Sequence, residues 1–172
     1  MHVLLGEKFF CRDTKKVARE LLGMVLVRRW RGREITATIT EVEAYDGFHD
    51  KASHASRGKT ARNAPMFGPP GYWYVYFTYG MHWMLNVVTR EQGYPAAVLI
   101  RGTDVVSGPG RLTKFLHIDK KLNGRPAVPA TGLWIESRGE ELSRYKIKRT
   151  PRIGVAYAGE EWAAKKWRFL IE

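Results

Sequence analysis

The sequence predicts a single α+β domain, residues 1–172, built on a largely antiparallel β-sheet with flanking helices and a protruding β-hairpin. Short β-rich runs bounded by glycine and polar residues recur along the chain, and two segments have the pattern of helices. No repeat, low-complexity segment or Pro/Ser-rich linker divides the chain. A chain of 172 residues buries roughly 70% of the surface that it exposes when unfolded, so a hydrophobic core can hold it together.

The predicted elements follow from caps, periodicity and turn residues. Residues 13–23 are predicted to be helical, because Asp13 or Thr14 can cap the first N–H groups and Gly23 can end the helix. Strands are predicted at Met24–Arg31 and Glu34–Tyr45, a hairpin at Tyr72–Val88 with its turn near Gly80, and a strand at Ala96–Arg101. A helix at Arg111–Ile118 and a polar loop at Asp119–Ala130 precede short strands at Leu133–Glu136, Arg152–Tyr157 and Trp167–Ile171.

The net charge of +12 comes from 29 Lys and Arg against 17 Asp and Glu. This excess favours a polyanionic partner, nucleic acid before an anionic membrane; the alternative is a basic globule without such a partner. The lone Cys11 excludes an internal disulfide framework. With no apolar run of about 18 residues and no secretory signal pattern, we expect a soluble intracellular protein, in the cytoplasm or nucleoid of a prokaryote or the nucleus of a eukaryote.

Residues 46–71 show neither helix nor strand periodicity. A structureless stretch well beyond about 15 residues inside a compact domain is usually functional or disordered. Large apolar residues within this segment can anchor it to a core, which favours a functional loop. Its cations Arg57, Lys59 and Arg62 are therefore the first candidates for phosphate contacts.

Two carboxylates, Glu41 and Glu43, stand in the second predicted strand. Alternation along a strand predicts that they share a face with the apolar residues Ile35 and Ile39. Burial raises the pKa of a carboxyl group, which suits a general base acting on water. The alternative is a pair of surface glutamates beside basic residues. A separation of about 7 Å would also fit an inverting glycan hydrolase, although the positive charge suits a neutral glycan poorly.

The predicted hairpin is rich in aromatic residues. Tyr72, Tyr74 and Tyr76 share one face of a strand, and Trp73, Val75, Phe77 and Tyr79 share the other. One face belongs to the core, and tyrosines on the opposite face could stack on planar bases, a contact worth about 1–3 kcal/mol. Tyr79 and Met81 at the turn form a candidate wedge of the kind that unstacks and extrudes a nucleotide. Cross-strand packing is the alternative, and it explains the strand aromatics better than the apolar turn.

Two further polar residues belong to apolar strands: Arg101 ends the predicted strand from Ala96, and Asn86 lies within the predicted hairpin. Arg101 needs an anion if it faces inward, and either a phosphate or Glu43 would serve. Asn86 needs hydrogen-bond partners and is either a structural or a base-reading residue. The histidines and carboxylates of the long loop match no metal-ligand spacing, so we expect no metal site.

A series of motifs follows in one order along nearly the whole chain. These motifs are Glu41-Val42-Glu43-Ala44-Tyr45, Ser53-His54, Ala61-Arg62-Asn63, Met66-Phe67, Tyr74-Val75-Tyr76, Tyr79-Gly80-Met81, Gly108-Pro109-Gly110-Arg111-Leu112 and Arg152-Ile153-Gly154-Val155. In this order they resemble the 3-methyladenine (alkyladenine) DNA glycosylase family. The resemblance implies a curved sheet and a monofunctional base-excision repair enzyme that flips bases and uses no metal or cofactor.

The resemblance also implies roles for the chemistry-bearing residues. Glu43 is expected to be the general base, and Arg101 to hold the water and the sugar-phosphate near it. Expected substrates are 3-methyladenine, 7-methylguanine, hypoxanthine and ethenoadenine in double-stranded DNA, acted on by a monomer. A carboxylate at Glu43 would also stabilise the positive charge that builds on the sugar as the N-glycosidic bond breaks.

Expected base-binding residues are Tyr45, His54, Tyr76 and Asn86. Tyr45 is expected on one face of the flipped base, and His54 with Tyr76 on the other. Asn86 is expected to reject the 2-amino group of normal guanine. Tyr79 would be the intercalating wedge and Met81 its support, whereas His82 stands where the family often has an aromatic residue.

Two alternatives of other classes remain open from the sequence. A non-catalytic nucleic-acid-binding module would use the same basic surface and tyrosines without releasing any base. A glycan hydrolase would require both Glu41 and Glu43.

Overall fold

Nine strands form one open sheet in the computed structural model, which describes residues 1–172. The strand order is β1-β7-β2-β3-β6-β5-β4, with β9 paired to β3 and β8 paired to β9, and the pairs are antiparallel. The strands are β1 (Val3–Leu4), β2 (Val25–Trp30), β3 (Arg33–Asp46), β4 (Trp73–Thr78), β5 (His82–Val88), β6 (Ala96–Thr103), β7 (Leu133–Ser137), β8 (Ile147–Thr150) and β9 (Arg168–Ile171). The predicted α+β class with a largely antiparallel sheet is confirmed.

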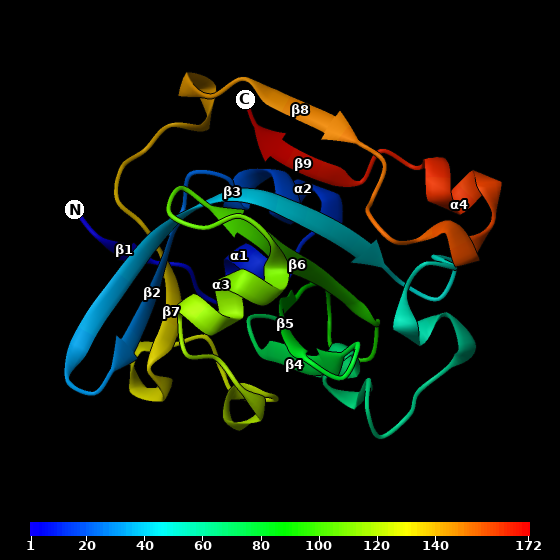
Figure 1. Ribbon diagram of the computed structural model, residues 1–172, viewed down its shortest axis with the longest axis horizontal. Helices are drawn as coiled ribbons and strands as arrows, with labels where there is room; N and C mark the ends of the chain where they lie inside the picture. Colours follow the sequence, from blue (N-terminus) through cyan, green and yellow to red (C-terminus); the bar gives the residue numbers. More distant parts are fainter.

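Four short α-helices accompany the sheet (Figure 1). They are α1 (Glu7–Phe10), α2 (Thr14–Leu21), α3 (Pro109–Phe115) and α4 (Glu160–Ala164). Helix α2 confirms the predicted capped helix, because the carboxylate of Asp13 accepts a hydrogen bond from the N–H of Lys16. Helix α3 begins two residues before the predicted start, since Pro109 occupies the first turn, where its missing N–H costs nothing.

The main hydrophobic core lies between the sheet and the two longer helices. Leu21 and Leu22 at the end of α2 and Leu112 of α3 pack in one cluster with Trp73 of β4 and Ile100 of β6. Each such side chain contributes about 1.5–3 kcal/mol when fully buried. This packing covers one face of the sheet. The opposite face of the sheet, near strands β3 to β6, is available to form a site.

Strand β3 is the longest strand, and its two halves pair with different neighbouring strands. It pairs with β2 through residues 33–38 and with β6 through residues 39–46. Its register against β6 shifts on both sides of Glu41, so Ile39 and Val42 both enter the main core. The prediction that Glu43 shares a face with Ile35 and Ile39 is therefore wrong, because a β-bulge, which alternation cannot anticipate, turns Glu43 to the opposite face.

The hairpin of β4 and β5 confirms the predicted alternation for Trp73, Tyr74 and Val75, whereas Phe77 and Tyr79 lie beyond the core and are exposed. Trp73 and Val75 enter the main core, whereas Tyr74 belongs to a second small cluster on the other face. Three residues, 79–81, connect the strands in a tight turn, in which Tyr79 and Gly80 have positive φ (53° and 65°) and the N–H of Met81 donates to the carbonyl of Thr78 at 3.2 Å. Tyr79 is 79% exposed and Met81 67% exposed, so the tip of the hairpin presents apolar side chains to solvent.

The predicted strand Arg152–Tyr157 is wrong. These residues form a turn with φ of +73° at Gly154, followed by a 3-10 turn at Ala156–Ala158. Strand β8 precedes this turn, and β8 and β9 lie side by side next to β3 in Figure 1. The long loop after β3 is ordered, with 3-10 turns at His54–Arg57 and Ala64–Phe67.

Candidate active site

Four neighbouring strands place one residue each in a row across the sheet. Glu43 of β3 pairs with Leu99 of β6, Leu99 pairs with Asn86 of β5, and Asn86 pairs with Tyr74 of β4. Directly paired residues point to the same face of a sheet. The row therefore lies on the face opposite the main core and defines the floor of a site.

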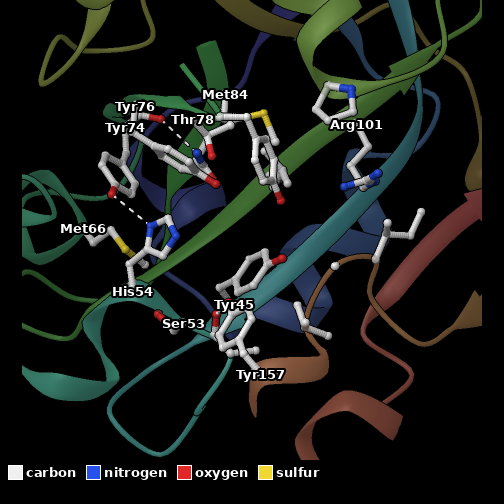
Figure 2. Close-up of a pocket in the computed structure, with 18 residues that line it drawn as sticks. Tyr45, Ser53, His54, Met66, Tyr74, Tyr76, Thr78, Met84, Arg101 and Tyr157 are labelled. Atoms are coloured by element: carbon white, nitrogen blue, oxygen red, sulfur yellow. Dashed lines mark hydrogen bonds between the residues drawn. The ribbon is translucent and has the colours of Figure 1, made fainter. Parts of the chain in front are cut away.

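A cavity of about 230 Å³ opens above this row. Of the predicted site residues, Tyr45, His54, Tyr76, Tyr79, Asn86 and Arg101 line it. Figure 2 shows Tyr45, His54, Tyr74 and Tyr76 directed toward the same space, with Arg101 along its far side. Residues far apart in the sequence are thus brought together around one pocket, whose lining is mostly apolar with a few polar groups.

Glu43 lies directly behind the pocket wall and is fully buried. Its Oε1 accepts hydrogen bonds from the hydroxyl of Tyr45 at 2.8 Å and from Nη1 of Arg101 at 3.5 Å. Its Oε2 accepts a hydrogen bond from the backbone N–H of Ile153 at 2.7 Å. The three donors belong to residues 45, 101 and 153, so three distant parts of the chain hold one carboxylate.

Burial raises the pKa of Glu43 above its ordinary value of 4.5. Arg101, the N–H of Ile153 and the hydroxyl of Tyr45 each lower this pKa and so limit the rise. The carboxylate is therefore both desolvated and supported by donors. Such an environment suits a group that takes a proton during a reaction.

Arg101 is held by a second carboxylate, Glu41. Oε1 of Glu41 accepts hydrogen bonds from Nε of Arg101 at 3.0 Å and from Nε of Arg168 at 2.7 Å. Arg168 in turn donates to the hydroxyl of Thr150 at 3.0 Å. Glu41 thus binds two guanidinium groups, and this contact holds the Arg101 side chain in position.

The aromatic wall opposite Tyr45 is formed by His54, Tyr74 and Tyr76. The Nδ1 of His54 lies 3.3 Å from the Tyr74 hydroxyl, and the rings of His54 and Tyr76 meet edge to face with centroids 4.7 Å apart. Burial, with the nearby charge of Arg62, lowers the pKa of His54. Burial raises the pKa of Tyr74 to about 12. At neutral pH this wall is therefore uncharged.

Asn86 is buried in the pocket floor beside this wall. Its Nδ2 donates a 3.1 Å hydrogen bond to the backbone carbonyl of Tyr74. Since the amide nitrogen has this partner within the sheet, the orientation of the side chain is fixed.

The three candidate phosphate contacts occupy different positions in the long loop. Arg57 lines a neighbouring groove rather than the pocket, and Lys59 lies over the ring of Phe67. Nη2 of Arg62 donates to the carbonyl of Phe77 at 2.7 Å, so this guanidinium connects the loop to the hairpin. None of the three side chains lines the pocket itself.

Sequence reasoning missed three contributors from the C-terminal part of the chain. The N–H of Ile153 reaches Glu43, Tyr157 lines the pocket, and Arg152 packs behind Tyr45. The Arg152-Ile153-Gly154-Val155 motif could have drawn attention to this segment, but a backbone donor leaves no side-chain pattern.

No group of three or more His, Cys, Asp or Glu side chains has the arrangement of a metal site. No helix is long and apolar enough to span a membrane.

Comparisons of this sequence with a protein-family model and with curated proteins agree with one another. The family model described as methylpurine-DNA glycosylase (MPG) matches residues 8–107 and 102–172. A protein of Methanocella arvoryzae named "Putative 3-methyladenine DNA glycosylase" is 44% identical over 186 residues, which is 96% of this chain and 91% of the relative. Proteins of the same name are 41% identical in Desulfitobacterium hafniense (98% and 95% covered) and 45% identical in Legionella pneumophila strain Lens (98% and 94% covered).

Proposed function

This chain belongs to the methylpurine-DNA glycosylase family, and on that basis we propose that it excises alkylated and deaminated purines from double-stranded DNA by flipping the base and activating a water with Glu43. Membership makes it a DNA-3-methyladenine glycosylase, a hydrolase of N-glycosyl bonds in DNA repair. The proposed substrates are 3-methyladenine, 7-methylguanine, hypoxanthine and ethenoadenine.

The observation that carries this mechanism is the environment of Glu43. A carboxylate offers about four lone-pair positions, and Tyr45, Arg101 and Ile153 use three of them. One position stays available to a water that enters from the adjacent pocket. Because Glu43 is desolvated and its pKa is raised, it is a stronger base than a carboxylate in solvent.

In the proposed reaction the water oxygen bonds to the sugar C1′ while the N-glycosidic bond breaks. The electron pair of that bond leaves with the purine, and the proton of the water passes to Glu43. Positive charge that develops on the sugar lies near the buried carboxylate, which stabilises it before the proton arrives. A cationic alkylated purine departs as a neutral molecule, so it needs no protein acid.

The pocket walls supply a stacking site for the flipped base. Tyr45 would stack on one face of the purine, and His54 with Tyr76 would contact the other. His54 is neutral, because its pKa is lowered, and so can accept or donate a hydrogen bond without repelling a cationic base. We propose that Asn86 on the floor excludes the 2-amino group of guanine.

Binding to the duplex is assigned to the hairpin tip and the loop cations. Tyr79, exposed at the pocket mouth, would fill the space that the flipped nucleotide leaves, with Met81 beside it. We propose phosphate contacts for Arg57, Lys59 and Arg62. Contacts of this kind make DNA affinity fall steeply with added salt.

A base-release assay tests the proposed function. Duplexes carrying 3-methyladenine, hypoxanthine or ethenoadenine are incubated with the protein and then examined for alkali-labile sites. Strand breaks that need alkali are expected, since a monofunctional enzyme leaves an intact abasic site. Strand breaks without alkali would indicate a lyase instead, and no release from any duplex would refute the proposal.

A further inference from the structure

A buried ion pair lies directly behind the pocket. The two terminal guanidinium nitrogens of Arg152, Nη1 and Nη2, donate to the carboxylate of Asp50 at 2.6 and 2.9 Å, and both side chains are fully buried. Arg152 also donates to the carbonyl of Ala44 at 2.9 Å. A bidentate pair removed from water is costly to keep, and either charge alone there would cost far more.

The guanidinium of Arg152 packs against the ring of Tyr45. Its central carbon lies 4.8 Å from the Tyr45 ring centroid and 4.9 Å from the Trp167 ring centroid, so the guanidinium contacts both aromatic rings. Its Nε has no hydrogen-bond partner. Tyr45 lines the pocket and Arg152 does not, so the cation occupies the rear face of the ring on whose front face a base would stack.

This arrangement matters for the charge of the base. Atoms in contact lie roughly 3.5–4 Å apart, which puts a base stacked on Tyr45 roughly 8–9 Å from the guanidinium carbon of Arg152. The intervening space is protein rather than water, so an unpaired guanidinium there would repel a cationic base. Asp50 is the group that cancels this charge.

We propose that the Asp50–Arg152 pair determines how well the pocket accepts cationic purines: Arg152 holds the Tyr45 ring in place, and Asp50 neutralises Arg152 so that a positively charged base can stack in front of it. The inference rests on the proposed function, in which Tyr45 stacks on the flipped base. It assigns a charge-selective role to two residues that never touch the substrate.

The test compares a cationic and a neutral lesion in otherwise identical duplexes. Single-turnover excision rate constants are measured for 7-methylguanine and for hypoxanthine below neutral pH. For each variant, the rate constant for the cationic 7-methylguanine is divided by that for the neutral hypoxanthine. Asp50→Asn leaves Arg152 charged, and the ratio is expected to fall on the order of tenfold. The double variant Asp50→Asn/Arg152→Gln removes both charges and is expected to return the ratio to that of the wild type.

If Asp50→Asn slowed the excision of both lesions equally, as a loss of packing would, the ratio would stay unchanged and the inference would be overturned. If Asp50→Asn does not fold, Arg152→Gln is compared with the double variant, since these two differ only in the Asp50 carboxylate. The ratio is expected to be higher in Arg152→Gln, and equal ratios would overturn the inference. Glu34→Gln, which disrupts only the exposed pair with Arg29, is the matched control. A wild-type protein that excises neither lesion would refute the proposed function and this inference with it.

Discussion

The backbone N–H of Ile153 donates a 2.7 Å hydrogen bond to Oε2 of Glu43, although 110 residues separate them in the chain. The carboxylate stands on β3, and the donor lies in the turn between β8 and the C-terminal helix α4. The C-terminal segment therefore completes the site that β3 begins. Gly154, the residue after this donor, holds the turn with a φ of +73°.

Replacing Gly154 with alanine should slow excision. A side chain at positive φ is strained by about 1–2 kcal/mol, and relief of that strain would move the N–H of Ile153 away from Glu43. We expect a fall in the single-turnover rate of about tenfold or more. Gly124→Ala is the matched control, because Gly124 has the same φ of +73° and no atom within 4 Å of an added Cβ. Equal rates in the two variants would show that the turn geometry does not serve the reaction.

Replacing Glu41 with glutamine should slow excision of every lesion to a similar extent. The amide cannot offer a carboxylate to Arg101 and Arg168, so Arg101 loses its anchor beside Glu43. We expect a loss of about tenfold in the single-turnover rate, with affinity for an abasic-site mimic retained. Glu20→Gln, which affects the more exposed pair with Arg12, should leave the rate unchanged. A rate at the wild-type level in Glu41→Gln would remove Glu41 from any supporting role.

Much of the pocket could be predicted because its residues stand on regular strands. Alternation along the hairpin correctly separates Trp73 and Val75 from the tyrosines of the opposite face. The helix over α2 follows from the cap at Asp13 and the apolar stripe behind it. In these segments local periodicity and tertiary packing agree, so the sequence pattern suffices.

Two features could not be predicted from local pattern. The β-bulge beside Glu41 depends on how β3 fits β6, a partner about 60 residues away, and it reverses the face of Glu43. The segment from Arg152 to Tyr157 has the composition of a strand, yet the buried pair of Arg152 with Asp50 fixes it as a turn. In both cases long-range contacts override the local preference.

Replacing Tyr79 with alanine should weaken base flipping. The exposed ring at the hairpin tip would no longer fill the gap left in the base stack. Ethenoadenine fluorescence, which rises when the base leaves the stack, should show a smaller change on binding. Excision of the same lesion should slow about tenfold, the loss of one base-stacking contact. Tyr79→Phe keeps the ring and should behave as the wild type; full flipping in Tyr79→Ala would make Tyr79 a packing residue.

The pH dependence of excision should report the raised pKa of Glu43. The base acts only when deprotonated, so the rate rises with pH through this pKa and then levels. Because burial raises the pKa of Glu43, the midpoint of the acid limb should lie above 4.5. A neutral lesion such as ethenoadenine is the suitable substrate. A midpoint at or below 4.5 would mean that another group, or none, serves as the base.

The most direct test of the mechanism is the Glu43→Gln variant on a duplex carrying hypoxanthine or ethenoadenine. Glutamine keeps the size of the side chain but cannot take a proton from water, so base release should fall by at least about 100-fold. Affinity for a duplex with an abasic-site mimic should stay close to that of the wild type, since Glu43 lies behind the pocket wall and is fully buried. Base release at the wild-type rate by a folded Glu43→Gln protein would contradict the assignment of Glu43 as the base.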